Sequence, residues 1–285
     1  MTNQLLIANR IIPQVGFGTL YITQNRGFGP RREDAVSLLR KAAKIGIKFF
    51  DTADSYGNGS AEQSLHDALY PYDDLIIATK GGYKHQQLGH WQPDARPASL
   101  RIALEGSLRR LNLETIDLYQ LHSVDSRVAY EDSIGTLKDM QNEGKIRHIG
   151  ISNVGLAQLK IARTETEVMS VQNALNIQHG TNSEVLDYCT KKKIPFISWM
   201  PLGDGSISWA EPVLCQLAEK YTSTPAQIAL AALLNISPCI LPIPGTSSVK
   251  HLNENFSAAS IELEPNDFIR LCKRYRINFP LTGTE

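Results

Sequence analysis

Short apolar runs alternate along the chain with longer stretches in which apolar residues recur every three or four positions. The short runs predict eight strands, at residues 14–18, 48–51, 75–80, 116–121, 146–152, 168–172, 195–198 and 240–244. The longer stretches predict eight helices, at residues 32–45, 60–69, 97–111, 130–143, 154–163, 183–192, 225–235 and 265–274. Prolines at three of the predicted helix starts and glycines at two of the predicted stops support these bounds.

The regular alternation of strand and helix predicts an α/β fold, a single (β/α)₈ barrel domain over residues 1–285. An open, doubly wound sheet is the alternative. Against it, the first strand (QVGFGT) is not followed by a GxGxxG turn that opens a helix. The segment LLIANRIIP before this strand predicts a short β-hairpin that turns at Ala8, Asn9 and Arg10. We expect this hairpin to plug one end of the barrel.

Composition narrows the class of protein. The 29 basic and 29 acidic residues give a formal net charge of zero, which argues against a nucleic-acid or anionic-membrane partner. No apolar run approaches the length of about 18 residues that a membrane span needs, and residues 1–14 do not resemble a signal peptide. The four cysteines lie far apart and have no metal-ligand spacing, so we expect neither disulfides nor a metal site. These features predict a cytoplasmic monomer that acts on a small molecule.

Polar residues stand where the predicted strands end, which is where barrel enzymes carry their chemistry. They are Asp51 and, shortly after it, Tyr56, then Lys80, His122, Ser152, Asn153 and Gln172. Taken alone, the ionisable residues have ordinary explanations. Asp51 could cap a helix and Tyr56 could be a surface ring. Lys80 could be a solvated charge, and His122 could be a hydrogen-bonded core histidine. Their occurrence at consecutive strand ends indicates a functional site.

These residue types suit proton transfer to a carbonyl group. A phenol with a pKa near 10 is a poor acid until its surroundings change. We expect the Lys80 ammonium to lower the pKa of Tyr56, and Asp51 to keep Lys80 charged and oriented. His122 then polarises the carbonyl oxygen or helps a proton to reach it. The set lacks an activated nucleophile, so acyl transfer is not expected.

Asp51, Tyr56, Lys80 and His122, in the segments DTADSYG, ATKGG and DLYQLHSVD, resemble the catalytic tetrad of the aldo-keto reductases. The segments GKIRHIGISN (144–153), VQNALN (171–176), PLG (201–203) and LPIPGTSSVKHLNEN (241–255) extend the resemblance over nearly the whole chain. It implies a barrel that binds NADPH without a Rossmann domain and reduces aldehydes or ketones. By the same resemblance Tyr56 is the general acid, Asp51 and Lys80 tune it, and His122 orients the carbonyl.

The resemblance also implies a set of cofactor residues. Asp51 lies near the nicotinamide ribose, Ser152, Asn153 and Gln172 hold the carboxamide, and Trp199 stacks on the nicotinamide ring where relatives often have tyrosine. The remaining cofactor residues are Pro201, Leu202, Gly245, Thr246, Ser247, Ser248, His251, Glu254 and Asn255. We expect the segment 245–255 to bind the adenosine 2′-phosphate at the start of a helix. His251 stands where many relatives have arginine, and Gly245 where some have lysine, but no acidic residue replaces either, so NADPH is still favoured over NADH.

The substrate pocket is expected from Tyr56, His122, Phe28 in loop 21–32 and Trp91 in loop 81–96. An aromatic wall beside polar groups favours a polar aromatic aldehyde or ketone. The segments FGPRRED (28–34) and ALYPYDDLIIATKGG (68–82) resemble bacterial reductases of the pyridoxal-reductase branch. Two alternatives stay open: a ketoreductase that tailors natural products, and an NADPH-binding regulatory module, similar to channel β-subunits, with little turnover.

Overall fold

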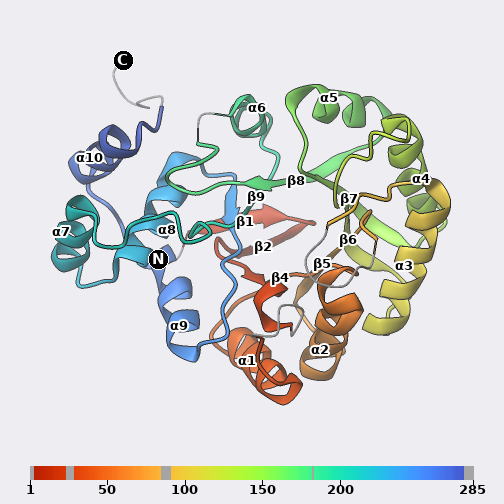
Figure 1. Cartoon of the computed structure of the whole chain (residues 1–285), viewed down its shortest axis with the longest axis horizontal. Helices are drawn as coiled ribbons and strands as arrows, with labels where there is room; N and C mark the ends of the chain where they lie inside the picture. Colours follow the sequence, from red (N-terminus) through yellow and green to blue (C-terminus); the bar gives the residue numbers. More distant parts are fainter. Residues whose placement is uncertain (1–2, 24–28, 85–90, 182, 279–285) are drawn as a thin grey trace.

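Eight parallel strands form one sheet in this computed structural model, which describes residues 3–23, 29–84, 91–181 and 183–278. The strands follow one another around the sheet in chain order: β3 (Phe17–Gly18), β4 (Phe49–Asp51), β5 (Ile76–Gly81), β6 (Ile116–Leu121), β7 (Ile146–Ser152), β8 (Val168–Ala174), β9 (Phe196–Trp199) and β10 (Ile240–Pro242). Figure 1 shows the sheet curled into a ring that the helices surround.

The first and last strands meet at a seam that closes the ring. The backbone N–H of Gly16 donates to the carbonyl oxygen of Pro242 at 2.9 Å, and the Gln14 side chain donates to the carbonyl oxygen of Ile240 at 2.7 Å. A Cβ atom on Gly18 would lie 2.7 Å from the carbonyl oxygen of Ile243, so only glycine permits this close approach. These contacts confirm the predicted barrel and exclude the open sheet.

Ten α-helices are present in the part of the chain that the structure describes. They are α1 (Arg32–Lys44), α2 (Ser60–Leu69), α3 (Pro97–Leu111), α4 (Tyr130–Asn142), α5 (Leu156–Glu165), α6 (Glu184–Lys192), α7 (Pro212–Lys220), α8 (Pro225–Ile236), α9 (Val249–Ser257) and α10 (Pro265–Tyr275). The prediction of eight helices was wrong at two places. Helix α7 was not predicted, and α9, expected only as a helix start near residue 248, is the helix that follows the last strand.

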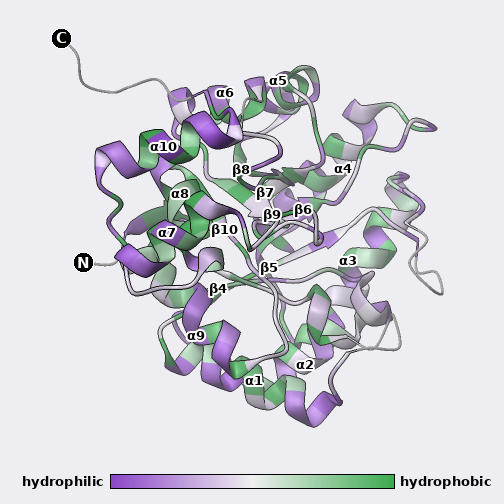
Figure 2. Cartoon of the chain, turned by 60° about the vertical axis from the view of Figure 1, so that its left-hand side comes forward, coloured by the Kyte–Doolittle hydropathy of each residue, from purple (hydrophilic) through white to green (hydrophobic). Residues whose placement is uncertain are grey.

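Helix α8 needs additional helices to cover its apolar surface. Its sequence PAQIALAALLNI is apolar on nearly every side, and most of its residues are buried. Helices α7 and α10 contact it, which buries a face that would otherwise be exposed to water. Figure 2 shows the hydrophobic α8 inside the more hydrophilic α7 and α10. No helix within the described ranges is long and apolar enough to cross a membrane.

The predicted N-terminal hairpin is confirmed. Strands β1 (Gln4–Ile7) and β2 (Arg10–Pro13) pair antiparallel around Ala8 and Asn9, which have positive φ angles of 48° and 59°. The hairpin lies across the middle of the ring in Figure 1. Its inward residues Leu5, Ile7 and Ile12 pack on side chains that the barrel strands contribute: Phe49, Ile76, Leu118, Ile197 and Leu241. The hairpin therefore seals one end of the barrel and leaves the chemistry to the other end.

Candidate active site

The four residues of the expected tetrad lie together where the strands end. Asp51 ends β4, Lys80 lies on β5, His122 follows β6, and Tyr56 begins the 3₁₀ turn Tyr56–Gly59. The Lys80 Nζ atom donates to Asp51 Oδ2 at 2.5 Å, to the carbonyl oxygen of Thr52 at 2.8 Å and to the Tyr56 hydroxyl at 3.5 Å. Lys80 is completely buried, so these groups hold its charge in one place.

A tight turn places the Tyr56 ring over the end of the barrel. The Tyr56 N–H donates to the carbonyl oxygen of Ala53, and the next three residues, Gly57, Asn58 and Gly59, have positive φ angles of 63°, 50° and 89°. Glycine and asparagine adopt this left-handed conformation at the lowest cost. The turn leads directly into α2, so the backbone of Tyr56 is fixed by the turn and by the helix that follows it.

Burial sets the protonation of the phenol. It raises the pKa of Tyr56 well above its usual range, and the negative charges of Asp51 and Asp54 raise that pKa further. The expected lowering of the Tyr56 pKa by Lys80 is therefore wrong, because the net shift of this pKa is upward. The physical reason is that burial of the ring disfavours the phenolate by more than the Lys80 ammonium, itself paired with Asp51 at 2.5 Å, favours it. Tyr56 carries its proton at neutral pH and can donate it.

The imidazole of His122 is neutral for the same reason. Burial lowers the pKa of His122 well below its usual range, and the nearby Lys80 charge lowers that pKa further. The Nδ1 atom is buried and has no hydrogen-bond partner among the described residues. The ring centroid lies 5.8 Å from that of Tyr56, with the rings nearly perpendicular. The site thus places a neutral imidazole beside a protonated phenol.

A cluster of amides and hydroxyls surrounds the other side of Asp51. Its Oδ1 atom accepts hydrogen bonds from Gln172 Nε2 at 2.7 Å and from Gln120 Nε2 at 3.2 Å. The Ser152 hydroxyl donates to the carbonyl oxygen of Gln172 at 2.8 Å. Gln120 was not among the predicted site residues, although a glutamine that interrupts the apolar strand IDLYQL marks the position in the sequence.

Trp199 and Asn153 continue this cluster toward the surface. The Trp199 Nε1 atom donates to Asn153 Oδ1 at 3.1 Å, and the Asn153 side chain donates to the carbonyl oxygen of His122 at 2.9 Å. The structure therefore brings together Trp199, Asn153 and the end of β6. Pro201 and Leu202 follow directly after β9, with Pro201 buried.

The segment 245–255 leads into α9 and includes most of that helix. Ser248 caps this helix and accepts a hydrogen bond from the His251 N–H at 3.4 Å. The first N–H groups of a helix have no partner within it, so this end attracts an anion. Lys250 is exposed and lies 3.8 Å from Glu254, measured from Nζ to Oε1. The other expected residues of the segment differ in burial: Thr246 and Asn255 are buried, Gly245 is half-buried and Ser247 is exposed.

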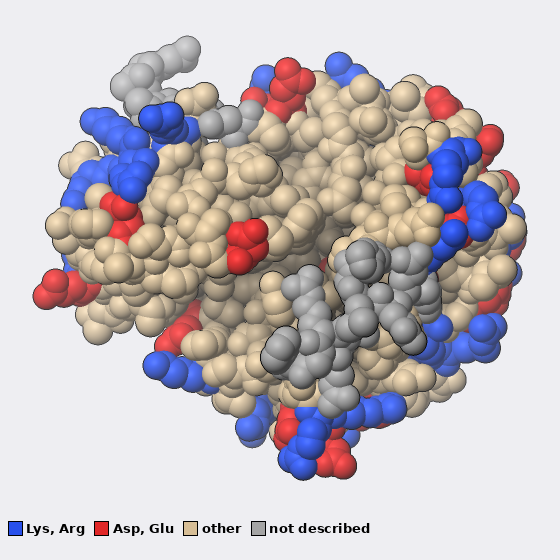
Figure 3. Space-filling model, in the orientation of Figure 1, with Lys and Arg blue, Asp and Glu red and all other residues tan. Residues whose placement is uncertain are grey.

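Aromatic rings line the space in front of the tetrad. The Tyr83 ring lies edge-on to His122 with centroids 4.6 Å apart, and the Trp91 ring lies 6.0 Å from both Tyr56 and His122. Tyr83, which the sequence analysis did not name, is held by a bridge to Pro93. Phe28 and the loop residues 85–90 lie outside the described residues. Figure 3 shows this face hollowed near its centre and bordered mainly by uncharged residues.

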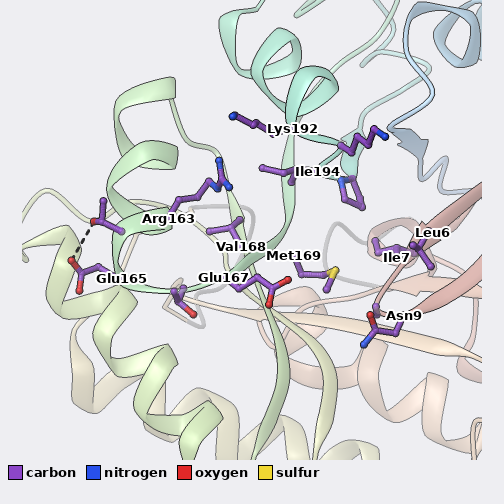
Figure 4. Close-up of a pocket in the computed structure, with 15 residues that line it drawn as sticks. Leu6, Ile7, Asn9, Arg163, Glu165, Glu167, Val168, Met169, Lys192 and Ile194 are labelled. Atoms are coloured by element: carbon purple, nitrogen blue, oxygen red, sulfur yellow. Dashed lines mark hydrogen bonds between the residues drawn. The ribbon is translucent and has the colours of Figure 1, made fainter.

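A separate cavity of about 590 Å³ lies beside the hairpin. Leu6, Ile7, Val168, Met169 and Ile194 line its apolar part, with charged side chains of α5 and α6 around it (Figure 4). None of the tetrad lines this cavity. Across the described ranges, no group of three or more metal-binding side chains comes together, and the four cysteines are free thiols.

Comparison with known proteins agrees with this geometry. The model of the Aldo/keto reductase family matches residues 14–275. An uncharacterized oxidoreductase of Schizosaccharomyces pombe is 39% identical over 267 residues, which cover 93% of this chain and 87% of that protein. Pyridoxine 4-dehydrogenase of Escherichia coli is 36% identical over 271 residues, which cover 92% of this chain and 94% of that enzyme.

Solved structures agree as well. A thermostable aldo-keto reductase in complex with the inhibitor epalrestat superposes with a TM-score of 0.84 at 28% identity, covering 96% of this chain and 99% of that one. An aldo/keto reductase of Klebsiella pneumoniae, in complex with NADP and acetate, has the same fold at 24% identity, with a TM-score of 0.84 over 100% of this chain and 98% of that one. The predicted resemblance is confirmed, and the chain belongs to the aldo/keto reductase family of oxidoreductases.

Proposed function

We propose that this protein reduces an aldehyde or ketone to the alcohol with NADPH, taking the proton from Tyr56. The observation that carries the proposal is the hydrogen-bonded series from Asp51 to Lys80 to the Tyr56 hydroxyl, with the neutral His122 beside it. A protonated phenol next to a buried ammonium is suited to give its proton to an alkoxide.

Each of these residues has a distinct part in the proton transfer. Tyr56 holds the proton until it is needed, because burial keeps its pKa high. Lys80 donates to the same oxygen and stabilises the phenolate that remains after transfer. Asp51 keeps Lys80 charged and oriented. The neutral His122 aligns the carbonyl oxygen by donating a hydrogen bond to it.

The residues around Asp51 suit a nicotinamide cofactor, which when bound supplies a hydride to the carbonyl carbon. Trp199 is half-buried and fixed by its bond to Asn153, so it offers an aromatic face for a ring to stack on. Ser152 adds a hydroxyl that accepts a hydrogen bond from the same Asn153 side chain, and Gln172 adds an amide that donates to Asp51. The capped start of α9 offers N–H groups for a 2′-phosphate, which favours NADPH over NADH.

The substrate that fits best is a polar aromatic carbonyl, with pyridoxal as the first candidate. The rings of Tyr83 and Trp91 form a wall against which a flat ring packs. The resemblance to Escherichia coli pyridoxine 4-dehydrogenase over 92% of the chain supports a pyridine ring in this position.

A turnover screen tests the proposal. NADPH oxidation is followed by absorbance with pyridoxal, 4-nitrobenzaldehyde, methylglyoxal and simple ketones, and repeated with NADH at equal low concentration. We expect turnover with NADPH to exceed turnover with NADH, and pyridoxal to be preferred. Tyr56→Phe is the matched control, since it keeps the ring and removes the proton donor; it should lower kcat by about 100-fold or more and leave the Kd for NADPH unchanged.

Two results would count against the proposal. Unchanged turnover of Tyr56→Phe would exclude Tyr56 as the acid. NADPH binding with no turnover of any carbonyl would instead favour a regulatory, cofactor-binding module.

A further inference from the structure

Gln120 is a polar side chain in the interior of the barrel, and it is fully buried. It lies on β6 directly between two strands, with Lys80 of β5 as its partner on one side and Gly150 of β7 on the other. Barrel interiors are filled mainly by Val, Ile and Leu, because a buried amide is costly unless its hydrogen bonds are made. A buried glutamine at this level of the barrel therefore calls for a partner, and the partner is Asp51.

Gln120 shares the Asp51 carboxylate with two other side chains. Its Nε2 atom lies 3.2 Å from Asp51 Oδ1, the same oxygen that Gln172 Nε2 contacts at 2.7 Å. The opposite oxygen, Oδ2, contacts Lys80 Nζ at 2.5 Å. Gln172 Nε2 also lies 3.5 Å from Gln120 Oε1, which links the two amides to each other. Both carboxylate oxygens are thus held, one by amides and one by the ammonium.

The neighbouring strand leaves space for this amide. A Cβ atom on Gly150 would lie 2.8 Å from Gln120 Cγ and 3.4 Å from Gln120 Oε1. It would also lie 2.6 Å from the hydroxyl of Ser170. Distances this short exclude a larger side chain at residue 150 unless Gln120 or Ser170 moves. The glycine therefore preserves the position of the Gln120 side chain.

We propose that Gln120 is a positioning residue of the reductase, an inference that rests on the proposed function. It holds Asp51 Oδ1 so that Oδ2 stays on Lys80 and Lys80 stays on the Tyr56 hydroxyl. A neutral amide suits this place because it stabilises the carboxylate without a positive charge that competes with Lys80 for it. An apolar side chain of the same size removes one of the two amides that hold Oδ1 and leaves Gln172 alone to fix that side of the carboxylate.

The first test replaces the amide with a thioether of similar shape. We expect Gln120→Met to lower kcat by about 10- to 100-fold, the range for losing a hydrogen bond to a charged group, with a smaller change in KM. Gln14→Met is the matched control. Gln14 is also a buried glutamine with a hydrogen-bonded side chain, but it lies in the seam of the barrel, bonded to Pro238 and Ile240. Both variants should lower the melting temperature, and only Gln120→Met should lower kcat.

The second test separates positioning from packing by its pH dependence. In Gln120→Glu the new carboxyl group is buried beside the Asp51 charge, and both effects raise its pKa; Lys80, its partner on β5, opposes them, but its charge is already paired with Asp51. While protonated, it donates an O–H to Asp51 as the amide does, and kcat should approach that of the parent. As pH rises, the new carboxyl group ionises and repels Asp51. The plot of kcat against pH should therefore show a decline that neither the parent nor Gln120→Met shows.

Three results overturn the inference: kcat of Gln120→Met within about twofold of the parent, an equal loss of kcat in Gln14→Met, or a Gln120→Glu profile that follows Gln120→Met at every pH. If Gln120→Met does not fold, the Gln120→Glu profile decides alone. If the parent reduces no carbonyl, the proposed function fails, and crystal structures of the parent and Gln120→Met then decide the matter. An Asp51 carboxylate turned away from Lys80 supports positioning, and an unmoved Asp51, Lys80 and Tyr56 exclude it.

Discussion

Strand β2 of the hairpin offers a paired test of how the barrel is sealed. Ile11 and Ile12 are neighbours of the same residue type that point to opposite faces. Ile12 is 2% exposed and packs on the barrel interior, whereas Ile11 is 69% exposed. Replacing each in turn with alanine compares burial with exposure at nearly the same place in the chain.

The expected magnitudes follow from that burial. Ile12→Ala removes buried methyl and methylene groups and leaves a cavity against Phe49 and Leu241, which costs about 2–5 kcal/mol. For a chain of 285 residues, such a loss lowers the melting temperature by roughly 3–8 °C. Ile11→Ala removes little buried surface and should change stability by no more than about 0.5 kcal/mol.

Differential scanning calorimetry and urea titration measure both changes, and turnover below the melting temperature serves as the control. We expect kcat to be the same in both variants and in the parent, because the hairpin lies at the end of the barrel away from Tyr56. Equal melting temperatures for the two variants would refute the conclusion that the inward face of the hairpin carries stability. A fall in kcat for Ile12→Ala alone would show that the two ends of the barrel are coupled.

Three further predictions concern the site. Lys80→Met should lower kcat by at least about 100-fold, because the phenolate of Tyr56 loses its hydrogen-bonded cation, and a kcat close to the parent's would contradict this role. Burial lowers the pKa of His122 below its unfolded value of about 6.5, so the unfolded state binds the extra proton and stability falls as pH falls. Between pH 6.5 and 5.5, urea titrations should show that the free energy of unfolding falls by about 1 kcal/mol more in the parent than in His122→Asn. Equal falls in the two proteins would contradict a buried neutral imidazole. Trp199→Ala should weaken NADPH binding by roughly fivefold in calorimetric titration, since stacking contributes about 1 kcal/mol, and an unchanged Kd would place the nicotinamide elsewhere.

The pattern of apolar residues was sufficient to predict the barrel because the parallel strands are largely buried on both faces and are therefore mainly apolar. The bounds of β7, residues 146–152, were predicted without error. Helix α7 was missed because it shares one βα connection with α8, so it does not correspond to a strand of its own. Its sequence PVLCQLAEK does carry the helical spacing.

The candidate site was likewise predicted in part from the sequence. Strand ends can be read along the chain, so the tetrad was found there and lies together in the structure. The direction of the Tyr56 pKa shift was wrong because it depends on how far the ring is buried and on the carboxylates that lie beside it. Gln120 was missed because its role depends on Asp51, which lies 69 positions earlier in the chain.

The seam has a consequence for how the protein is made on the ribosome. Gln14 and Gly16 complete their hydrogen bonds with Ile240 and Pro242, partners that are 226 residues away in each case. At about 5–20 residues per second, that stretch takes roughly 10–45 s to synthesise. During this time β3 and the newest strand both present open edges, which are sites for pairing with other chains. The nascent barrel therefore stays prone to aggregation until its last strand emerges, and a chaperone that shields strand edges should raise the yield of folded protein.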